Sequence, residues 1–578
     1  MAKKKTRHPA AADTAPAKAA ATQTAPPQPA HRQFALVIPF LEKHSRLLAL
    51  IAIVLGTLRI VSTYSDTALT WDEPGHMACG LQYLAEHVYL YEAQHPPLAR
   101  VASALIPYLS GARPMHTTHQ DQEGVNVMYR SGHPGTMLTQ MRLGILPFFV
   151  LASAMVFLWG RRHFGAAVGV LSAALFTLVP TVLAHAGLAT TDMPLTACFT
   201  AAFFAMLVWA EAPTWENSVL LGVATGFAVV SKFTVLGFFP AAAGLAAIAW
   251  LMVARPGVSG AIDAVKARAL PFVAAIATGA LVIWAVYSFS FGTPAKWSFP
   301  VPAPSLFEGI EFALHHNKVG HTAYFLGEIR NTGWWYFFPV LLLLKTPAAW
   351  LVLLFFGIGV WFARRVQLAV WMPVAFAAGI LIPSMTSHVN IGLRHILPIY
   401  SGLSILAALG LEKLLQDAPR KLWAAALAVL MPLWLLISGL AQHPNYLPYF
   451  NLLADLKTDN RPERIVVDSD LDWGQDTIRL ARRMKELGAT EVSYNTLNLT
   501  PERLAVWPGL PAVRNINPVK PAEGWTAVSP TLWMVREYGL QHRYPDIHPW
   551  FTYLQPRERV GSLLLYYVPK GSIPPELR

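Results

Sequence analysis

The chain has 578 residues, of which 54% are hydrophobic and only 13% are charged, and its mean hydropathy is +0.39. Soluble domains average about 25% charged residues, so this composition excludes an ordinary soluble protein and indicates a polytopic membrane protein. The formal net charge is +12, but the Lys and Arg residues lie mostly in short loops between apolar runs, which indicates membrane orientation and not nucleic-acid binding. Two cysteines exclude a disulfide framework and a cysteine zinc site.

The first segment, residues 1–33, is rich in Ala, Pro, Thr and Lys and shows no apolar periodicity. Such a segment cannot bury enough surface to fold, so we expect a disordered tail. The first apolar run begins near Leu47 and no small-residue cleavage pattern follows it, so we do not expect a signal peptide. The basic residues between Lys3 and Arg7 predict that this end lies in the cytoplasm.

Residues 45–440 contain eleven segments that approach the roughly 20 apolar residues a bilayer-spanning helix needs. They are 47–64, 141–159, 165–185, 193–210, 218–231, 234–253, 269–289, 346–363, 367–386, 396–414 and 421–440. Basic clusters such as Arg161-Arg162 and Arg364-Arg365 fall at every second loop, on the side of the N-terminus, as the positive-inside rule requires. The predicted fold class is therefore an α-helical polytopic membrane protein with about eleven transmembrane helices.

The opposite face receives two long loops, residues 65–140 and 290–345. Within the first loop, residues 74–90 and 97–109 have the pattern of amphipathic helices that lie along a membrane surface. The second loop is rich in Pro, Trp, Phe and Tyr, which is typical of the membrane interface.

The chain after residue 441 has a different character and is predicted to form an α/β domain outside the membrane. Strands are predicted at 464–467, 491–495 and 563–568, and a helix at 476–487. A segment of this size, 441–578, is within the range of an independently folded domain.

An acidic run in this segment, Asp468, Asp470 and Asp472, has the alternation of a calcium loop. An EF-hand loop requires glycine at position six and glutamate at position twelve. Here the glycine is at position seven and Arg479 is at position twelve, so we expect a strand-to-helix loop and no calcium. The sequence predicts no other cofactor, and it leaves open whether the membrane site holds a divalent cation.

Nine ionisable residues gather on the outer side, in or beside apolar runs. Charges at membrane level cost about 2.5–3.5 kcal/mol each, so they are candidates for a functional site. They are Asp72, Glu73, His95, Arg100, Asp192, Lys232, Lys345, Arg394 and His395. Structural alternatives stay open: Asp72 and Asp192 could cap the helices that follow them. Lys232 and Lys345 could extend to the membrane interface.

The chemistry that suits this set combines carboxylates, which deprotonate an acceptor hydroxyl, with cations, which hold a phosphate leaving group. A polyprenyl-phosphate-linked sugar has the matching form, with a lipid tail in the bilayer and a phosphate and sugar at its surface. The rival class is a secondary transporter. Transporters place ionisable groups near the middle of the membrane and often show inverted repeats, whereas these charges lie at one interface and we find no repeat.

The chain resembles the GT-C superfamily of glycosyltransferases, in particular the protein O-mannosyltransferases and the bacterial phospholipid-carrier-dependent glycosyltransferases. The resemblance covers about residues 45–500. It rests on Asp72-Glu73, His95-Pro96-Pro97-Leu98, Asp192, Ser231-Lys232-Phe233, Lys345-Thr346-Pro347, Asn390-Ile391-Gly392-Leu393-Arg394-His395 and the run from Val467 to Asp476.

This resemblance implies an inverting transfer of a mannose-like hexose or a pentose from a polyprenyl-phosphate donor, at the outer face of a bacterial inner membrane. It implies that Asp72 is the general base and that Glu73 and Asp192 orient the acceptor or shape the site. It implies that the donor is bound by His95, Arg100, Lys232, Lys345, Arg394 and His395. Arg100 departs from the lysine that the mannosyltransferases usually carry there, and this exchange is not neutral at a phosphate site. The acceptor stays open between a protein Ser/Thr hydroxyl, a lipid and a cell-envelope glycan.

Overall fold

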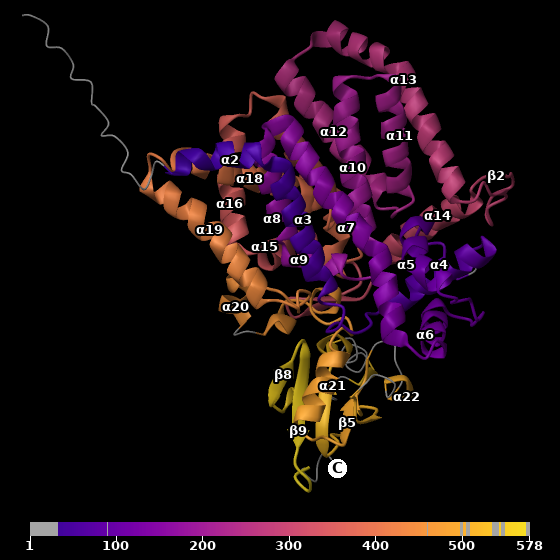
Figure 1. Cartoon of the computed structure of the whole chain (residues 1–578). Coiled ribbons are helices and arrows are strands. Elements are labelled where there is room, and N and C mark those ends of the chain that lie inside the picture. Colours follow the sequence, from indigo (N-terminus) through magenta and orange to yellow (C-terminus); the bar gives the residue numbers. More distant parts are fainter. Residues whose placement is uncertain are drawn as a thin grey trace, which may run out of the picture.

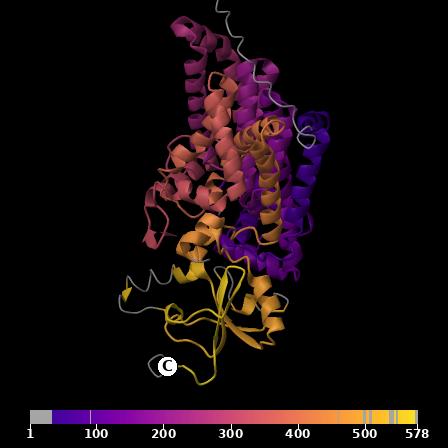
Figure 2. The same ribbon diagram turned by 90° about the vertical axis from the view of Figure 1, so that its left-hand side faces the viewer.

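A computed structural model describes residues 33–89, 91–458, 461–496, 501–504, 509–534, 543–544 and 549–573. The predicted tail, residues 1–33, lies outside the described residues except for Gln33. A bundle of helices occupies the upper part of Figure 1, and the C-terminal residues form a separate layer below it. Figure 2, turned by 90°, shows the same two layers.

Apolar helices account for most of the bundle. They are η1 (Gln33–Leu36), α2 (Val37–Lys43), α3 (Ser45–Val61), α7 (Pro134–Phe164), α8 (Ala166–Thr177), α9 (Pro180–Ala186), α10 (Asp192–Glu211), α11 (Trp215–Val229), α12 (Val235–Ala254), α13 (Gly257–Val286), α15 (Phe337–Lys345), α16 (Ala348–Ala363), η2 (Leu368–Val370), α17 (Trp371–Ser384), η3 (Leu393–Ile396), α18 (Ile399–Asp417) and α19 (Leu422–Ala441).

The described helices confirm a polytopic membrane protein, but they do not confirm eleven spans. By length and composition, five of them are able to cross a membrane, or eight if each of three bent helix pairs is one span. Pro180 and Pro347 stand at two of these bends, where a proline removes a helical hydrogen bond. The predicted spans 218–231 and 367–386 form helices α11 and α17 of only 15 and 14 residues, which are too short to cross alone.

The first outer loop folds into three helices, α4 (Glu73–Glu86), α5 (Pro97–Leu109) and α6 (Gln120–Arg130), which pack on one another. They lie at the lower end of the bundle beside α14 (Pro304–Val319), between the bundle and the C-terminal layer (Figure 1). The helices predicted at 74–90 and 97–109 are therefore confirmed, the second with its predicted bounds. This placement brings the first outer loop to the end of the bundle where the ionisable residues gather.

The C-terminal layer contains a five-stranded mixed sheet in the order β6-β5-β7-β9-β8. β5 pairs in parallel with β6 and β7, whereas β9 pairs antiparallel with β7 and β8. The described elements are α20 (Leu452–Thr458), η4 (Pro462–Arg464), η5 (Asp468–Asp470), α21 (Thr477–Glu486), β5 (Glu491–Tyr494), α22 (Pro501–Leu504), β6 (Ala512–Arg514), β7 (Gly524–Val528), η6 (Trp550–Thr552), β8 (Glu558–Val560) and β9 (Leu563–Val568).

Three of the four elements predicted in this layer are found as α21, β5 and β9, but the strand predicted at 464–467 is wrong. Its first residue ends a 3-10 turn that begins at Pro462, and Val466 makes only an isolated bridge to Phe325. Phe325 belongs to the second outer loop, whose short strands are β1 (Phe291–Gly292), β2 (Val301–Pro302), β3 (Ala323–Phe325) and β4 (Glu328–Arg330). The segment therefore joins the C-terminal layer to the bundle.

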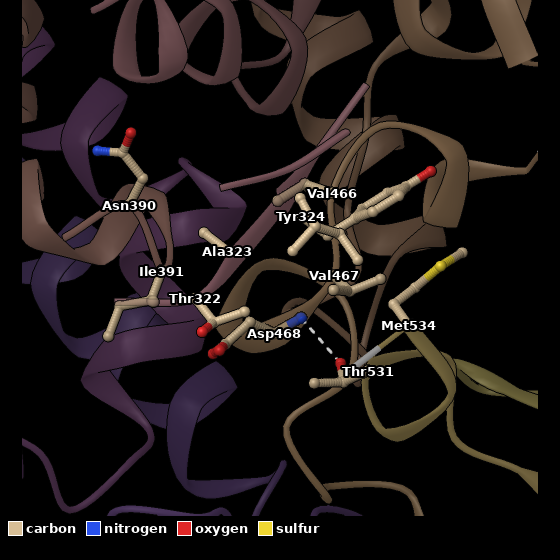
Figure 3. Close-up of a pocket in the computed structure, with 11 residues that line it drawn as sticks. Thr322, Ala323, Tyr324, Asn390, Ile391, Val466, Val467, Asp468, Thr531 and Met534 are labelled. Atoms are coloured by element: carbon tan, nitrogen blue, oxygen red, sulfur yellow. Dashed lines mark hydrogen bonds between the residues drawn. The ribbon is translucent and has the colours of Figure 1, made fainter. Parts of the chain in front are cut away.

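A small cavity lies at this junction, between β3, Asn390-Ile391 and Val466–Asp468 (Figure 3). The backbone N–H of Asp468 donates to the Thr531 hydroxyl at 2.8 Å across its edge. The volume is about 20 Å³, which is room for about one water molecule. It is therefore a packing feature of the interface and too small for a substrate.

Candidate active site

A large cavity of about 850 Å³ lies between the first outer loop and the adjoining ends of α12, α14 and α17. One part of its wall is polar and is lined by Asp72, His76, Glu92, His95, Arg100, Gln120, Asp121, Lys232, His316, His321, Arg394 and His395. Another part is apolar and includes Leu236, Phe312 and Leu314, whose side chains are exposed. The cavity thus joins a charged wall to an apolar surface in the bundle.

Asp72 lies on this wall, at the residue before α4. Its side chain makes no capping hydrogen bond to the helix, in contrast to the capping alternative. Instead Oδ2 accepts a hydrogen bond from Arg394 Nη1 at 2.8 Å, and the side chain is 24% exposed. The carboxylate is therefore both ion-paired and open to the cavity.

Asp192 links two cations behind Asp72. Its Oδ1 accepts from Lys232 Nζ at 2.6 Å, and its Oδ2 lies 3.5 Å from Arg394 Nη1. Its side chain does not cap α10, and Lys232 is 7% exposed, so neither the capping alternative nor an extended lysine describes this pair. Buried charges are costly unless they are paired, and here they alternate in sign from Asp72 through Arg394 and Asp192 to Lys232.

Glu73, next to Asp72, does not line the cavity and is fully buried. Arg142 donates to both of its carboxylate oxygens at 2.8 and 2.9 Å, and further bonds come from Thr70 and the backbone N–H of Ala189. Burial by itself would raise the pKa of Glu73, but Arg142 and these hydrogen bonds hold it below its usual value. The contacts connect α4 to α7 and to the turn before α10.

His95 and Arg100 both line the cavity, and Glu92 stands beside them. Arg100 is 2% exposed and donates from Nη1 to the Glu92 carbonyl at 2.7 Å and from Nη2 to its carboxylate. Burial, with the Arg100 charge added, lowers the pKa of His95 well below its usual value. His95 is therefore a neutral imidazole, which offers the cavity a hydrogen-bonding group and no charge.

Lys345 is the one predicted donor-binding residue that does not line the cavity. Its ammonium donates to the carbonyl oxygens of Leu447, at 2.9 Å, and Asp470, and the side chain is 1% exposed. It therefore points from the end of α15 toward the chain after α19. His395 does line the cavity, and its buried Nε2 has no hydrogen-bond partner among the described residues.

Six of the polar residues named on the cavity wall were missed from sequence, among them His76 and Asp121. His76 follows Asp72 by four residues, a spacing that places both on one helix face and was a usable signal. Burial lowers the pKa of His76 to about 4, and no residue in the described part of the chain forms a hydrogen bond with its Nε2. Asp121 comes from α6 and lies against Gly75, where a Cβ atom would stand 2.6 Å from Oδ1. Burial, with the charges of Asp72 and Glu92, raises the pKa of Asp121 to about 6.

The described residues contain no group of three or more His, Cys, Asp or Glu side chains arranged to hold a metal ion. A divalent cation in the site was left open from the sequence, and it stays open. The arrangement that the residues do offer is a carboxylate, Asp72, paired with Arg394, with Lys232 lining the same cavity. It suits removal of a proton beside a bound anion.

Residues 135–284 match the family model for dolichyl-phosphate-mannose-protein mannosyltransferases. The match confirms the predicted resemblance to the GT-C membrane glycosyltransferases. A comparison with curated proteins gives no match.

Among solved structures, ArnT from Cupriavidus metallidurans in the apo state is similar, with a TM-score of 0.47 and 14% identity over 89% of this chain and 97% of that chain. The same protein bound to undecaprenyl phosphate is similar with a TM-score of 0.46 and 13% identity, over 91% of this chain and 99% of that chain. The S. cerevisiae protein O-mannosyltransferase Pmt1–Pmt2 complex bound to the sugar donor is similar with a TM-score of 0.33 and 17% identity. This match covers 44% of this chain and 35% of that chain.

Proposed function

We propose that the protein transfers a sugar from a polyprenyl-phosphate donor to an acceptor hydroxyl, at the outer face of a bacterial inner membrane. The observation that carries this proposal is the large cavity, which is lined by Asp72, Arg394 and Lys232 on one part of its wall and by exposed apolar side chains on another. A donor with an anionic head and a lipid tail is complementary to both walls. The name of the matched family includes a donor of this kind, dolichyl-phosphate-mannose.

Asp72 acts as the general base on the acceptor hydroxyl. The acceptor oxygen then attacks the anomeric carbon of the sugar, the bond from this carbon to the phosphate oxygen breaks, and the electron pair leaves with the polyprenyl phosphate. Attack from the face opposite to the phosphate inverts the anomeric centre. The leaving phosphate gains a negative charge, which Arg394 and Lys232 stabilise because they are held in place by Asp192 before the reaction begins.

The ion pair between Asp72 and Arg394 connects donor binding to catalysis. The Asp72 carboxylate and the Arg394 guanidinium are 2.8 Å apart. A donor phosphate that binds Arg394 competes for this contact and leaves Asp72 free to accept a proton. The neutral imidazoles of His76 and His95, whose rings lie 5.2 Å apart, offer hydrogen bonds to the sugar between the two charged groups.

We assign Glu73 to the support of α4, since its carboxylate accepts hydrogen bonds from Arg142 and from the backbone N–H of Ala189. Arg100 supports the segment around Glu92 and His95 on the cavity wall. The sugar is a hexose or a pentose, and the acceptor is a protein Ser/Thr hydroxyl, a lipid or a cell-envelope glycan.

The test is transfer of a radiolabelled sugar from its polyprenyl phosphate by the purified chain, with an envelope extract that contains protein, lipid and glycan acceptors. Asp72→Asn is compared with native protein and with Asp66→Asn, a matched change six residues earlier. Asp66 pairs with Arg482 and does not line the cavity. We expect native protein and Asp66→Asn to transfer label and folded Asp72→Asn to transfer at least 100-fold less, as loss of a general base predicts (about 10²–10⁴-fold).

The labelled fraction then identifies the acceptor class. Equal transfer by Asp72→Asn and native protein would assign the base to another residue, with Asp192 the next candidate. If native protein transfers no label from any donor offered, the glycosyltransferase proposal fails, and substrate flux into vesicles becomes the measurement that tests the transporter alternative.

A further inference from the structure

The loop from Ser469 to Gln475 reaches from the C-terminal sheet into the region behind the cavity. It contains the alternating acidic residues singled out in the sequence, and none of its residues lines the cavity itself. Asp470 accepts hydrogen bonds from the backbone N–H of Leu393, at 3.0 Å to Oδ2. Gly392 has φ of +144°, and a Cβ atom there would overlap the Ser469 hydroxyl, so the two segments meet at the closest approach a backbone allows.

Two side chains of this loop, neither of which lines the cavity, contact Arg394. The Nε of Arg394 donates to Ser469 Oγ at 3.1 Å, and its guanidinium carbon lies 4.2 Å from the centre of the Trp473 ring. Ser469 Oγ also donates to the carbonyl of Ile391. Arg394 Nη1 also forms the ion pair with Asp72. The guanidinium is therefore fixed by this ion pair, by the hydrogen bond to Ser469 and by the face of the Trp473 ring.

The same loop also holds the segment that leads into Asp72. The backbone N–H of Ala68 donates to the Gln475 carbonyl at 2.8 Å, and the N–H of Trp71 donates to the Trp473 carbonyl at 3.2 Å. One loop therefore contacts both partners of the Asp72–Arg394 pair, which are 322 residues apart in the sequence.

The loop is itself tied to the sheet beneath it. Thr531 Oγ1 donates to the Asp472 carbonyl at 2.6 Å, and Ser529 donates to the Asp472 carboxylate. Asp476, directly after the loop, accepts from the N–H and hydroxyl of Ser562 at 2.8 and 2.6 Å. The acidic residues thus connect the loop to the domain and to the bundle.

We propose that the loop 469–475 is a positioning element of the active site, in which Trp473 and Ser469 orient Arg394 for the donor phosphate and the backbone at 473–475 fixes the approach to Asp72. The C-terminal domain is then part of the catalytic unit and not an appended module. The consequence for phosphate binding rests on the proposed function, whereas the orientation of the two segments does not.

The experiment uses the purified full chain and compares Trp473→Leu and Ser469→Ala with Trp550→Leu. Trp550 is the matched control, because it is a tryptophan of the same domain, 1% exposed, that packs on Phe551 and Tyr566 away from Arg394. Binding of undecaprenyl phosphate gives the first readout. Amide hydrogen exchange of peptides 66–74 and 390–397, without ligand, gives the second.

We expect Trp473→Leu to raise the Kd for undecaprenyl phosphate by about tenfold, as loss of a desolvated cation–π contact predicts. It should also speed exchange in both peptides, and Trp473→Phe should restore most of each change. Trp550→Leu should leave the Kd and both peptides unchanged. If Trp473→Leu and Trp550→Leu alter them alike, or if exchange in both peptides is unchanged in Trp473→Leu, the positioning role is overturned.

The two proposals fail separately. If native protein does not bind undecaprenyl phosphate, the proposed function fails on that arm. The exchange measurement then still decides the positioning role, because it requires no ligand.

Discussion

Glu73→Gln separates a structural carboxylate from a catalytic one at adjacent positions. In the native structure Oε2 accepts from Arg142 Nη2 at 2.9 Å and from the N–H and hydroxyl of Thr70 at 2.9 and 3.0 Å. A glutamine would keep the acceptor Oε1 but would place an NH₂ donor against some of these donors, and Arg142, which is 0% exposed, would lose its counter-charge. Removing one partner of a buried pair costs about 3–5 kcal/mol.

The assay is unfolding of the purified protein by SDS in mixed micelles, followed by tryptophan fluorescence. Asp72→Asn is the control, because the Asp72 side chain is partly exposed and Arg394 keeps Asp192 as a second counter-charge when the Asp72 charge is removed. We expect Glu73→Gln to be destabilised and Asp72→Asn to be stable but inactive. The double variant Glu73→Gln/Arg142→Met should recover part of the lost stability, because it removes the unpaired charge. A Glu73→Gln protein with native stability and no activity would refute this reasoning and place Glu73 in the chemistry.

Three further predictions follow from the cavity and its surroundings. Asp192→Asn removes the carboxylate between Lys232 and Arg394, so kcat/KM for the donor should fall by about 100-fold in initial-rate measurements; an unchanged value would show that the cations need no such support. Lys345→Met should lower stability to SDS and leave the donor KM unchanged, since the ammonium bonds to Leu447 and not to the cavity; a tenfold rise in KM would return this lysine to the donor site. Asp121, whose pKa burial raises to about 6, is ionised above this pH and neutral below it. Because a neutral side chain does not repel the donor phosphate, the donor KM should fall as pH drops through 6, and Asp121→Asn should keep the low KM at every pH; a pH-independent KM in native protein would contradict this sign.

Local sequence patterns determined the elements of this protein. Apolar length predicted a membrane bundle, and amphipathic periodicity predicted α4 and gave the bounds of α5, because both signals depend on residues close together in the chain. The same patterns led to nine ionisable residues, of which six line one cavity, namely Asp72, His95, Arg100, Lys232, Arg394 and His395, while Asp192 contacts Lys232 and Arg394.

Tertiary structure alone decided what each charge faces. Asp72 and Glu73 are adjacent acidic residues, but only the Asp72 side chain is open to the cavity. Successive residues at a helix point about 100° apart, and the packing of neighbouring elements determines which of the two side chains is buried. Lys345 stands at a helix end as the sequence suggested, yet it faces Leu447, a contact that no local pattern carries. The loop at Trp473 is the clearest case. It contacts Arg394 and the segment before Asp72 in the folded structure, and the sequence did not predict this because contacts between distant segments produce no periodic pattern.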